Sequence, residues 1–368
     1  MSIKAGLVGL PNVGKSTLFN ALTKSSAPME NYPFCTIDPH EAITQVPDSR
    51  IHELQKIYNS GKTIPATVTF VDIAGLVKGA STGEGLGNQF LANIREVDLI
   101  LHVLRCFEDP NIIRSTEVDP IGDFDIIMAE LMLKDIEAID NRIPKVEKSL
   151  KGKLTGAEQK TFNEELELLR ALRVALEHGD ALKAKTLVMH ANTKTISLLS
   201  TKNFLVIANI AEGELENKEY LSNKHYKALV DHFGENSVIP ISARVEYELT
   251  QMEPAEADEF MEIMGITQTG LDAIIKKTYD NLGLITFFTC GPKEIHAWPI
   301  RKGITIRAAA GEIHSDLERG FICSETFGYH DVVALKTESA IKTAGKMRIE
   351  GQGYLVQDGD IVHIRFNV

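Results

Sequence analysis

The chain carries the stretch Gly9-Leu10-Pro11-Asn12-Val13-Gly14-Lys15-Ser16, which fits the phosphate loop G-x-x-x-x-G-K-[ST] at every fixed position. An apolar run at residues 3–8 precedes the stretch, and residues 16–24 carry helix formers. The sequence therefore predicts a strand, a glycine loop and a helix in direct succession, which is the context that this motif requires. The alternative is a tight turn followed by an accidental Lys-Ser pair.

Two side chains of this stretch predict contact with a nucleotide. The backbone N–H groups of such a loop point inward, and the N-terminus of the following helix adds partial positive charge. We expect the Lys15 ammonium to reach the β- and γ-phosphates, and the Ser16 hydroxyl to bind Mg²⁺.

Length and composition bound the class of protein. With 368 residues, 43% of them hydrophobic, the chain is long enough for two or three domains and a sizeable core. It has neither a run of eighteen apolar residues nor a basic start followed by an apolar stretch, so we expect no membrane span and no secretory signal. The four cysteines are scattered, which favours free thiols in the cytoplasm over disulfides or zinc.

The net charge of -12 argues against a general nucleic-acid coat, because contact with phosphates depends on basic surface. The charge is uneven along the chain. Residues 284–368 hold ten Lys or Arg and ten Asp or Glu, so the acidic excess lies in the remainder. Any contact with RNA should therefore be local, and charge alone does not place it.

Five apolar, β-branched runs indicate buried strands at residues 3–8, 68–71, 99–104, 204–208 and 238–241. Helical stretches separate most of these runs, which predicts an α/β fold with a parallel sheet covered by helices on both faces. Such doubly wound sheets bind ligands at the carboxyl ends of their strands.

A long insertion separates the third and fourth of these runs. Its apolar residues follow a 3-4-3-4 spacing typical of a coiled-coil seam: Ala129, Met132, Ile136, Ile139, Ile143, Val146 and Leu150. A second stripe follows a polar turn at residues 151–156: Phe162, Leu166, Leu169, Leu172 and Leu176. We predict an antiparallel helical hairpin that projects from the nucleotide domain. The alternative is a pair of helices packed flat on the sheet.

From about residue 284 the segments become short and turn signals frequent, which predicts a separate, small, β-rich module. Residues 354–364 at its end are interpreted as a hairpin in which Asp358-Gly359 supplies the turn.

Asp72-Ile73-Ala74-Gly75 follows the second strand and gives a D-x-x-G motif. We expect the Asp72 carboxylate to hold Mg²⁺ through water, and the Gly75 N–H to approach the γ-phosphate closely. The glycine-rich residues 75–88 predict a switch segment, with a flexible surface loop as the alternative. Thr36 is a candidate to complete the Mg²⁺ shell, or else an ordinary turn threonine.

We expect the nucleotide base to be selected by Asn209-Ile210-Ala211-Glu212, at the position where GTPases have the motif N-K-x-D. The Asp of that motif accepts two hydrogen bonds from guanine, and adenine offers neither donor. Here Ile210 replaces the Lys and Glu212 replaces the Asp, so the guanine clamp is altered at two of three fixed positions. Ser242-Ala243 occupies the usual place of the backbone that supports the base.

The hydrolytic machinery differs from that of common GTPases. Leu76 stands where a water-orienting Gln often follows D-x-x-G, so the sequence predicts slow hydrolysis or another means of positioning water. The catalytic group is not identified, and Lys15 and Gly75 are candidates. Asn12 is a candidate ligand for K⁺ beside the β- and γ-oxygens, or a loop residue that tolerates unusual dihedral angles.

Together these motifs resemble the Obg-like P-loop ATPases, and within them the YchF group. The resemblance also rests on residues 83–90, and in the C-terminal part on residues 309–314, 344–348 and 358–360. It implies a Ras-like nucleotide domain, a coiled-coil hairpin and a C-terminal β-grasp TGS domain. The implied boundaries are 1–283 for the nucleotide domain, with the helical insert at about 128–200, and 284–367 for the TGS domain.

The resemblance also implies functional residues. Residues from Asn12 to Thr17 (Asn12, Val13, Gly14, Lys15, Ser16 and Thr17) would bind phosphates, Ser16 and Thr36 would bind Mg²⁺, and Asn209 with Ile210 would lie at adenine. Some members of the group have a His after the third strand that is thought to assist hydrolysis. The corresponding stretch here, residues 111–114, ends in Arg114, which is therefore either a stabiliser of transition-state charge or an exposed surface arginine.

These implications give one main hypothesis, a slow Mg²⁺-dependent ATPase that acts as a nucleotide switch and binds the ribosome, at the large subunit or as a whole. RNA contact through the TGS domain or the helical hairpin is a further candidate. One alternative is a nucleotide-gated adaptor for the ribosome or a protein, in which hydrolysis is incidental. The other alternative is an ordinary GTPase.

Overall fold

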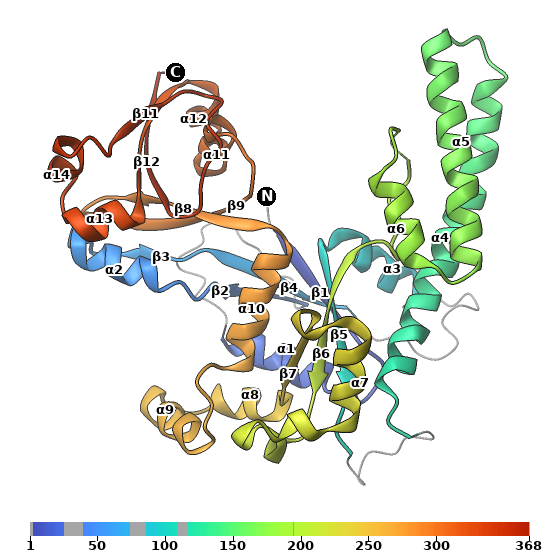
Figure 1. Ribbon diagram of the computed structural model, residues 1–368, viewed down its shortest axis with the longest axis horizontal. Helices are drawn as coiled ribbons and strands as arrows, with labels where there is room; N and C mark the ends of the chain where they lie inside the picture. The colour runs from blue at the N-terminus through green and yellow to red at the C-terminus, as the bar shows by residue number, and fades with distance from the viewer. Residues whose placement is uncertain (1–2, 26–39, 74–85, 109–116, 194, 368) are drawn as a thin grey trace. The chain divides into compact units, whose positions relative to one another are not determined.

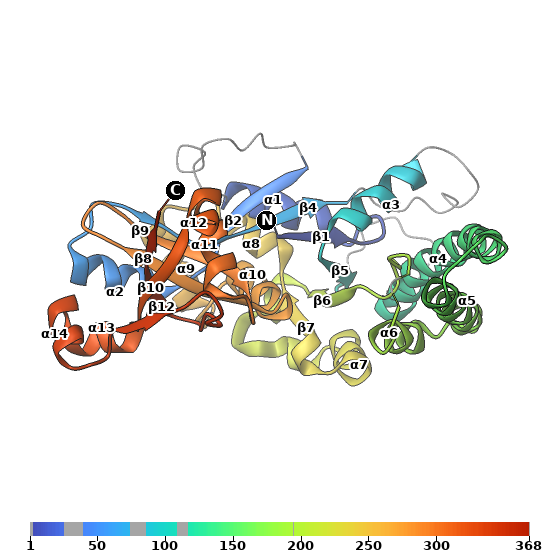
Figure 2. The same ribbon diagram turned by 90° about the horizontal axis from the view of Figure 1, so that it is seen from above.

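A computed structural model of the chain describes residues 3–25, 40–73, 86–108, 117–193 and 195–367, without the side chains of residues 86–89. The chain divides into two compact units. One contains Met1–Ala5, Phe19–Phe70 and Thr267–Val368, and the other contains Gly6–Leu18 and Val71–Ile266. Figures 1 and 2 show the ribbon from two directions.

The first sheet has six strands in the order β2-β4-β1-β5-β6-β7. Their bounds are β1 (Lys4–Val8), β2 (Glu41–Gln45), β4 (Thr67–Asp72), β5 (Leu99–Arg105), β6 (Asn203–Asn209) and β7 (Val238–Ile241). Strands β5, β6 and β7 are parallel, and their paired residues bring Arg105, Asn209 and Ile241 to the same edge. All residues of β5 are buried, as expected for a strand covered on both faces. The five predicted strands are confirmed, and β2 is an addition.

Helices of the same α/β part alternate with these strands. Their bounds are α1 (Lys15–Lys24), α3 (Leu86–Glu96), α7 (Lys224–Phe233), α8 (Ala243–Leu249) and α9 (Pro254–Ile263). A buried apolar cluster joins α3 and α7 to the strands and includes Ile94, Leu104, Val206 and Leu229. The predicted succession of strand, glycine loop and helix is present as β1, residues 9–14 and α1.

The insertion forms three helices, α4 (Pro120–Leu150), α5 (Gly156–Glu177) and α6 (Ala181–Met189). Helix α4 begins before the expected boundary near residue 128, because the Asp119 carboxylate accepts a hydrogen bond from the Gly122 N–H at 3.0 Å and Pro120 follows it. Figure 1 shows α4 and α5 side by side and antiparallel, extending away from the strands, so the predicted projecting hairpin is confirmed.

The hairpin has its own apolar core, which contains most of the two predicted stripes. Ile139, Val146 and Leu169 are almost fully buried there. Ala129 is the exception, since it is exposed while its neighbours Ile127 and Met128 pack into the cluster beneath the sheet.

A buried carboxylate ties the hairpin to the sheet. Asp135 of α4 accepts hydrogen bonds from the backbone N–H groups of Leu199 and Ser200, both at 2.8 Å, and from the Ser200 hydroxyl at 2.6 Å. These bonds fix α4 to the segment that leads into β6.

The second sheet has six strands in the order β11-β10-β12-β8-β9-β3. Their bounds are β3 (Thr63–Ile64), β8 (Leu284–Cys290), β9 (Ile295–Arg301), β10 (Phe321–Gly328), β11 (Arg348–Glu350) and β12 (Asp360–Phe366). The remaining helices are α2 (Ser49–Tyr58), α10 (Gly270–Asn281), α11 (Ile306–Ile313), α12 (Ser315–Arg319), α13 (Tyr329–Leu335) and α14 (Glu338–Thr343). This sheet therefore takes one strand, β3, from the first part of the chain.

The predicted hairpin at residues 354–364 is wrong, although its turn is present. Gly359 has φ 82° and the Asp360 N–H donates to the Gln357 carbonyl at 3.1 Å. However, β12 pairs with β10 and β8 on its two sides, so no edge is left for the preceding residues. Residues 354–356 bond instead to the segment around Ile304, whose carbonyl accepts from the Val356 N–H at 3.1 Å.

Among the described helices, none combines the length and the apolar character needed to cross a bilayer. The predicted fold class, an α/β nucleotide domain with an inserted helical hairpin and a C-terminal domain, is confirmed. The domain boundaries drawn from the sequence stay predictions.

Candidate functional site

The predicted phosphate loop lies between β1 and α1 and depends on backbone shapes that few residues adopt. Asn12 has φ 65° and Gly14 has φ 93°, both in the left-handed region. A Cβ atom at Gly14 would lie 2.1 Å from the Asn209 amide nitrogen, and one at Gly9 would lie 2.8 Å from the Val103 carbonyl oxygen. Both glycines of the motif are thus required for space, and Gly14 is required for its dihedral angle as well.

Lys15 and Asp72 meet beside this loop. Lys15 begins α1, Asp72 ends β4, and the Lys15 ammonium forms an ion pair with the Asp72 carboxylate. Both side chains are mostly shielded from solvent, with 10% and 19% exposed, whereas the neighbouring Ser16 is exposed. The two motifs that the sequence placed 57 positions apart therefore form one site.

The donor set fits Mg²⁺ bound together with a nucleotide. The described residues contain no group of three or more His, Cys, Asp or Glu side chains able to hold a metal ion by themselves. Mg²⁺ in nucleotide sites is held by one or two protein oxygens and completed by phosphates and water. Ser16, which follows Lys15 in the sequence, and Asp72, which pairs with the Lys15 ammonium, offer such oxygens.

Several sequence candidates lie outside the described residues. They are Thr36, Gly75, Leu76, Arg114 and the glycine-rich residues 75–85. Their predicted roles in binding Mg²⁺, the γ-phosphate and the attacking water stay predictions.

Asn209 joins the predicted base site to the phosphate loop. Its side chain is buried at the end of β6, and its amide nitrogen donates to the Val13 carbonyl at 2.8 Å. Its amide oxygen accepts from the Ala243 N–H at 3.0 Å. An Asn amide nitrogen carries two hydrogens, so a second hydrogen bond from it is possible, and its predicted contact with a base stays a prediction. Asn209 thereby links the end of β6 to the phosphate loop at Val13 and to the start of α8 at Ala243.

The other base-site candidates differ in exposure. Ile210 and Ser242 are each 2% exposed, and the Ile210 side chain belongs to the apolar core. Glu212 is half exposed, and its carboxylate lies 3.5 Å from the Arg244 guanidinium, which also contacts Glu248 at 2.9 Å. Contact of Ile210, Glu212 and Ser242 with a base stays a prediction.

Sequence reasoning missed two polar residues, Glu214 and Asn223, that fix the backbone after β6. The Glu214 carboxylate accepts from the Ala211 N–H at 3.0 Å and from the Asn223 amide at 2.8 Å, and Asn223 also donates to the Cys106 carbonyl at 2.8 Å. These bonds fix the short helix that begins at Glu212. An acidic residue three positions after Ala211 was the available signal, since it satisfies a free N–H at a helix start.

A third missed residue is Arg105 at the end of β5. It is 4% exposed, and its Nε donates to the Phe107 carbonyl at 2.9 Å while the guanidinium lies over the Phe107 ring. Its position at the end of a mostly apolar strand gave no sign of a structural role at the sheet edge.

Burial shifts the pKa values of His102, which lies on the same strand as Arg105, and of Cys106, which follows that strand. Desolvation lowers the pKa of His102 to about 3, and it raises the pKa of the Cys106 thiol to about 12. Both groups are thus neutral at pH 7. Neither the buried imidazole nor the thiol offers a charge to the carboxyl ends of β5 and β6.

Comparison with known proteins identifies the family. The family model described as "50S ribosome-binding GTPase" matches residues 4–142, and YchF-GTPase_C, described as "Protein of unknown function (DUF933)", matches residues 284–367. A Bacillus subtilis (strain 168) protein named "Ribosome-binding ATPase YchF" is 46% identical over 376 residues, with both chains fully covered. The chain belongs to the YchF family.

Other members of the YchF family agree in sequence and in structure. An Escherichia coli O157:H7 protein of the same name is 44% identical over 371 residues, again with both chains fully covered. A solved structure described as that of the Schizosaccharomyces pombe YchF GTPase superposes with a TM-score of 0.85 at 37% identity, covering 99% of this chain and 98% of that one. The names of these proteins differ in the nucleotide, ATP for the first two proteins and GTP for the third.

Proposed function

We propose that this chain is a slow, Mg²⁺-dependent ATPase that acts as a nucleotide switch and binds the ribosome. The observation that carries the proposal is the meeting of Lys15, next to the Ser16 hydroxyl, with Asp72 at the glycine loop. This arrangement supplies a cation for the phosphates and two oxygens for Mg²⁺. When bound, Mg²⁺ neutralises charge on the phosphate oxygens.

The proposed reaction is a nucleotide hydrolysis with little help to the attacking water. Lys15 and the backbone of the loop orient the triphosphate, and Asp72 holds the metal side of the site. Leu76 replaces the usual Gln and has no polar atom to orient water, which supports a low rate. Arg114 and Gly75 stay candidates for the remaining help.

The preference for ATP is supported by sequence and by relatives. Ile210 and Glu212 alter two positions of the guanine clamp, and the bacterial relatives with full coverage are named ATPases. The alternative, a GTPase, is favoured by the description of the yeast structure.

Calorimetric titration of the full chain with ATP and with GTP, in Mg²⁺ and K⁺, tests this choice. We expect tighter binding of ATP, no measurable binding to Lys15→Ala, and unchanged folding of that variant. Tighter binding of GTP would overturn the ATP assignment, and wild-type affinity in Lys15→Ala would overturn the site. Omitting K⁺ tests Asn12 as a ligand, and the proposed K⁺ site predicts slower hydrolysis without it.

Ribosome binding is supported by the names of the bacterial relatives and by the description of one matching family model. It accords with the cytoplasmic location expected from the sequence. Single-turnover hydrolysis with and without ribosomes separates the proposed switch from an adaptor. Strong acceleration by ribosomes supports the switch. An unchanged rate with nucleotide-dependent ribosome affinity supports the adaptor, and absence of any ribosome affinity contradicts both.

A further inference from the structure

Two polar side chains outside the predicted base-binding segment, residues 209–212, hold the backbone of that segment. The Glu214 carboxylate accepts one hydrogen bond from the Ala211 N–H at 3.0 Å and another from the Asn223 amide at 2.8 Å. The same amide nitrogen of Asn223 donates to the carbonyl of Cys106, the residue that follows β5, at 2.8 Å. The two residues, called here the Glu214–Asn223 pair, therefore join the segment to the end of the neighbouring strand.

Asn223 has no hydrogen-bonding capacity left for a ligand. Its amide nitrogen donates to Glu214 and Cys106, and its amide oxygen accepts from the backbone N–H groups of His225 at 2.8 Å and Tyr226 at 3.0 Å. An Asn side chain has two donor hydrogens and two acceptor lone pairs, so all four are used. Asn223 thus caps α7 and orients Glu214 at the same time.

Strand pairing fixes only the first part of the base-binding segment. The Ile210 N–H donates to the Ile241 carbonyl at 2.8 Å, where the pairing of β6 with β7 ends. The next N–H, that of Ala211, is bound by the Glu214 carboxylate instead, and the Ala211 carbonyl accepts from the Glu214 N–H at 3.1 Å. The direction in which the chain enters Glu212 therefore depends on Glu214 rather than on the sheet.

We propose that Glu214 and Asn223 are positioning residues that set the selectivity for the nucleotide base by fixing the backbone of residues 209–212. This inference rests on the proposed nucleotide hydrolysis and adds two residues that act on the base through Ala211 and Glu212. The predicted phosphate site has its own groups, because Lys15 pairs with Asp72 and neither contacts the Glu214–Asn223 pair. Loss of the pair should therefore weaken recognition of the base and spare recognition of the phosphates.

Calorimetric titration of the full chain with ATP, GTP and inorganic tripolyphosphate, each with Mg²⁺, tests the proposal. In Glu214→Gln the single amide oxygen cannot accept from both Ala211 and Asn223. We expect the affinity for the preferred nucleotide to fall by about 5- to 10-fold, as for the loss of one hydrogen bond, and the ratio of ATP to GTP affinity to approach one. Tripolyphosphate has no base, so its affinity should stay close to wild type.

Asn223→Asp gives a second test that keeps the start of α7. The Asp oxygens still accept from the N–H groups of His225 and Tyr226, but the variant loses both donors and places a carboxylate against Glu214. We expect the same loss of selectivity. The double variant Glu214→Gln/Asn223→Asp restores their hydrogen bond in the opposite direction, with the Gln amide as the donor. It should therefore recover part of the selectivity that the single variants lose, and a purely additive loss would contradict the coupling.

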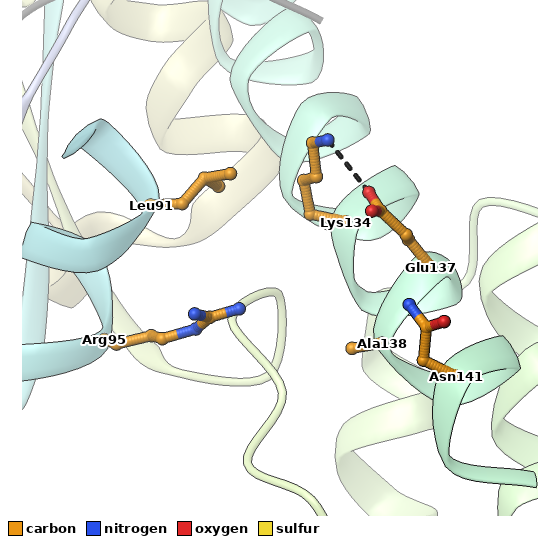
Figure 3. A pocket seen from close by; sticks show the side chains of 6 residues that line it. All are labelled: Leu91, Arg95, Lys134, Glu137, Ala138 and Asn141. Atoms are coloured by element: carbon orange, nitrogen blue, oxygen red, sulfur yellow. Dashed lines mark hydrogen bonds and ion pairs between the residues drawn. The ribbon is translucent and has the colours of Figure 1, made fainter. Parts of the chain in front are cut away.

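The matched control is Glu137→Gln, which neutralises another hydrogen-bonded carboxylate of the same compact unit. Glu137 accepts from Lys134 at 2.9 Å. Figure 3 shows this pair on α4, in a groove of about 270 Å³ to which α3 contributes Arg95. None of the residues that line the groove belongs to residues 209–212 or to the Glu214–Asn223 pair. The control should bind all three ligands as the wild type does, and thermal unfolding verifies that every variant is folded.

The outcomes separate this inference from the proposed function. If the wild type prefers ATP and both single variants keep the selectivity of the control, the positioning role is wrong and the proposed ATPase stands. If the wild type prefers GTP and both variants lose that preference, the positioning role stands and the ATP assignment fails. Equal losses of affinity for tripolyphosphate and nucleotides, or a wild type that does not discriminate between the two bases, would overturn the positioning role.

Discussion

The phosphate loop and the helical hairpin belong to one chain and use their residues in opposite ways. At the loop, Gly14, Lys15 and Asn209 each meet a separate requirement of space, charge or hydrogen bonding. In the hairpin, many apolar side chains share one seam. We expect single substitutions to abolish function at the loop and only to reduce it at the hairpin.

Substitution of one glycine in each region, Gly14 in the loop and Gly156 in the hairpin, should give the largest difference in stability between the two regions. In Gly14→Ala the new Cβ would meet the Asn209 amide at 2.1 Å, and φ +93° disfavours any side chain. We expect a loss of about 3 kcal/mol in the free energy of unfolding, together with loss of nucleotide binding. In Gly156→Ala, at the start of α5, no atom lies within 4 Å of the new Cβ. That variant should change stability by less than ~1 kcal/mol.

Urea unfolding of both glycine variants measures the difference. Similar losses in the two would mean that the loop has no special steric requirement, and the comparison between loop and hairpin would fail.

Substitution of His102 tests the packing of α4 against the sheet, because the His102 ring of β5 contacts Phe124 of α4. The ring is fully buried 4.6 Å from the Phe124 ring, and neither ring nitrogen has a hydrogen-bond partner among the described residues. Burial lowers its pKa to about 3 in the folded protein, so from about pH 6.5 down to 3 the unfolded chain binds a proton that the folded chain excludes. Stability therefore falls as the pH falls through this window.

We expect His102→Phe to remove this dependence. Between pH 7 and pH 5 the wild type should lose about 2 kcal/mol more than the variant, from the difference between pH 5 and an unfolded pKa near 6.5. Urea unfolding at the two pH values measures it. Equal pH slopes for the two proteins would contradict the assignment of His102 as a buried neutral group.

Within the hairpin, one ion pair should matter more than another. Arg142→Ala leaves the Glu165 carboxylate, 4% exposed, without its partner, so we expect a loss of about 1–2 kcal/mol. The matched variant Arg173→Ala breaks a pair with Asp140 in which both side chains are well exposed, and should cause no measurable change. Thermal unfolding distinguishes them, and the reverse order would show that burial does not decide the contribution.

The smallest expected effect concerns Glu212 in the predicted base-binding site. Glu212→Asp shortens the side chain that Arg244 contacts at 3.5 Å and restores the acceptor of the guanine clamp. We expect the ratio of ATP to GTP affinity to fall by about 5-fold, or ~1 kcal/mol. Competition titration measures the ratio, with Glu248→Gln as the control on the other side of Arg244. An unchanged ratio would mean that Glu212 takes no part in base choice.

Local patterns predicted much of this molecule. The glycine loop, the five strands and the two apolar stripes were each visible in short windows, because a single helix or strand leaves its period in the sequence. The ion pair of Lys15 with Asp72 was not predicted, although it agrees with the rule that ligand residues gather where parallel strands end.

Other features depend on contacts between distant residues and could not be predicted. Strand β3 joins a sheet built mostly from residues beyond 283, and its two residues carry no signal for that partner. The hairpin expected at residues 354–364 failed because β12 already has a neighbour on each side. Asn209 was placed at the base, but its bonds to Val13 and Ala243 were not foreseen.

The two hydrogen bonds made by the side-chain amide of Asn209 have a thermodynamic consequence for ligand recognition. Since one side chain braces the predicted phosphate-binding segment at Val13 and the predicted base-binding segment at Ala243, ordering either segment should prepare the other. Adenosine and inorganic triphosphate added as separate fragments should therefore bind with positive cooperativity. Each fragment alone would have to order both segments and would bind weakly for that reason, so the intact nucleotide gains affinity from being whole.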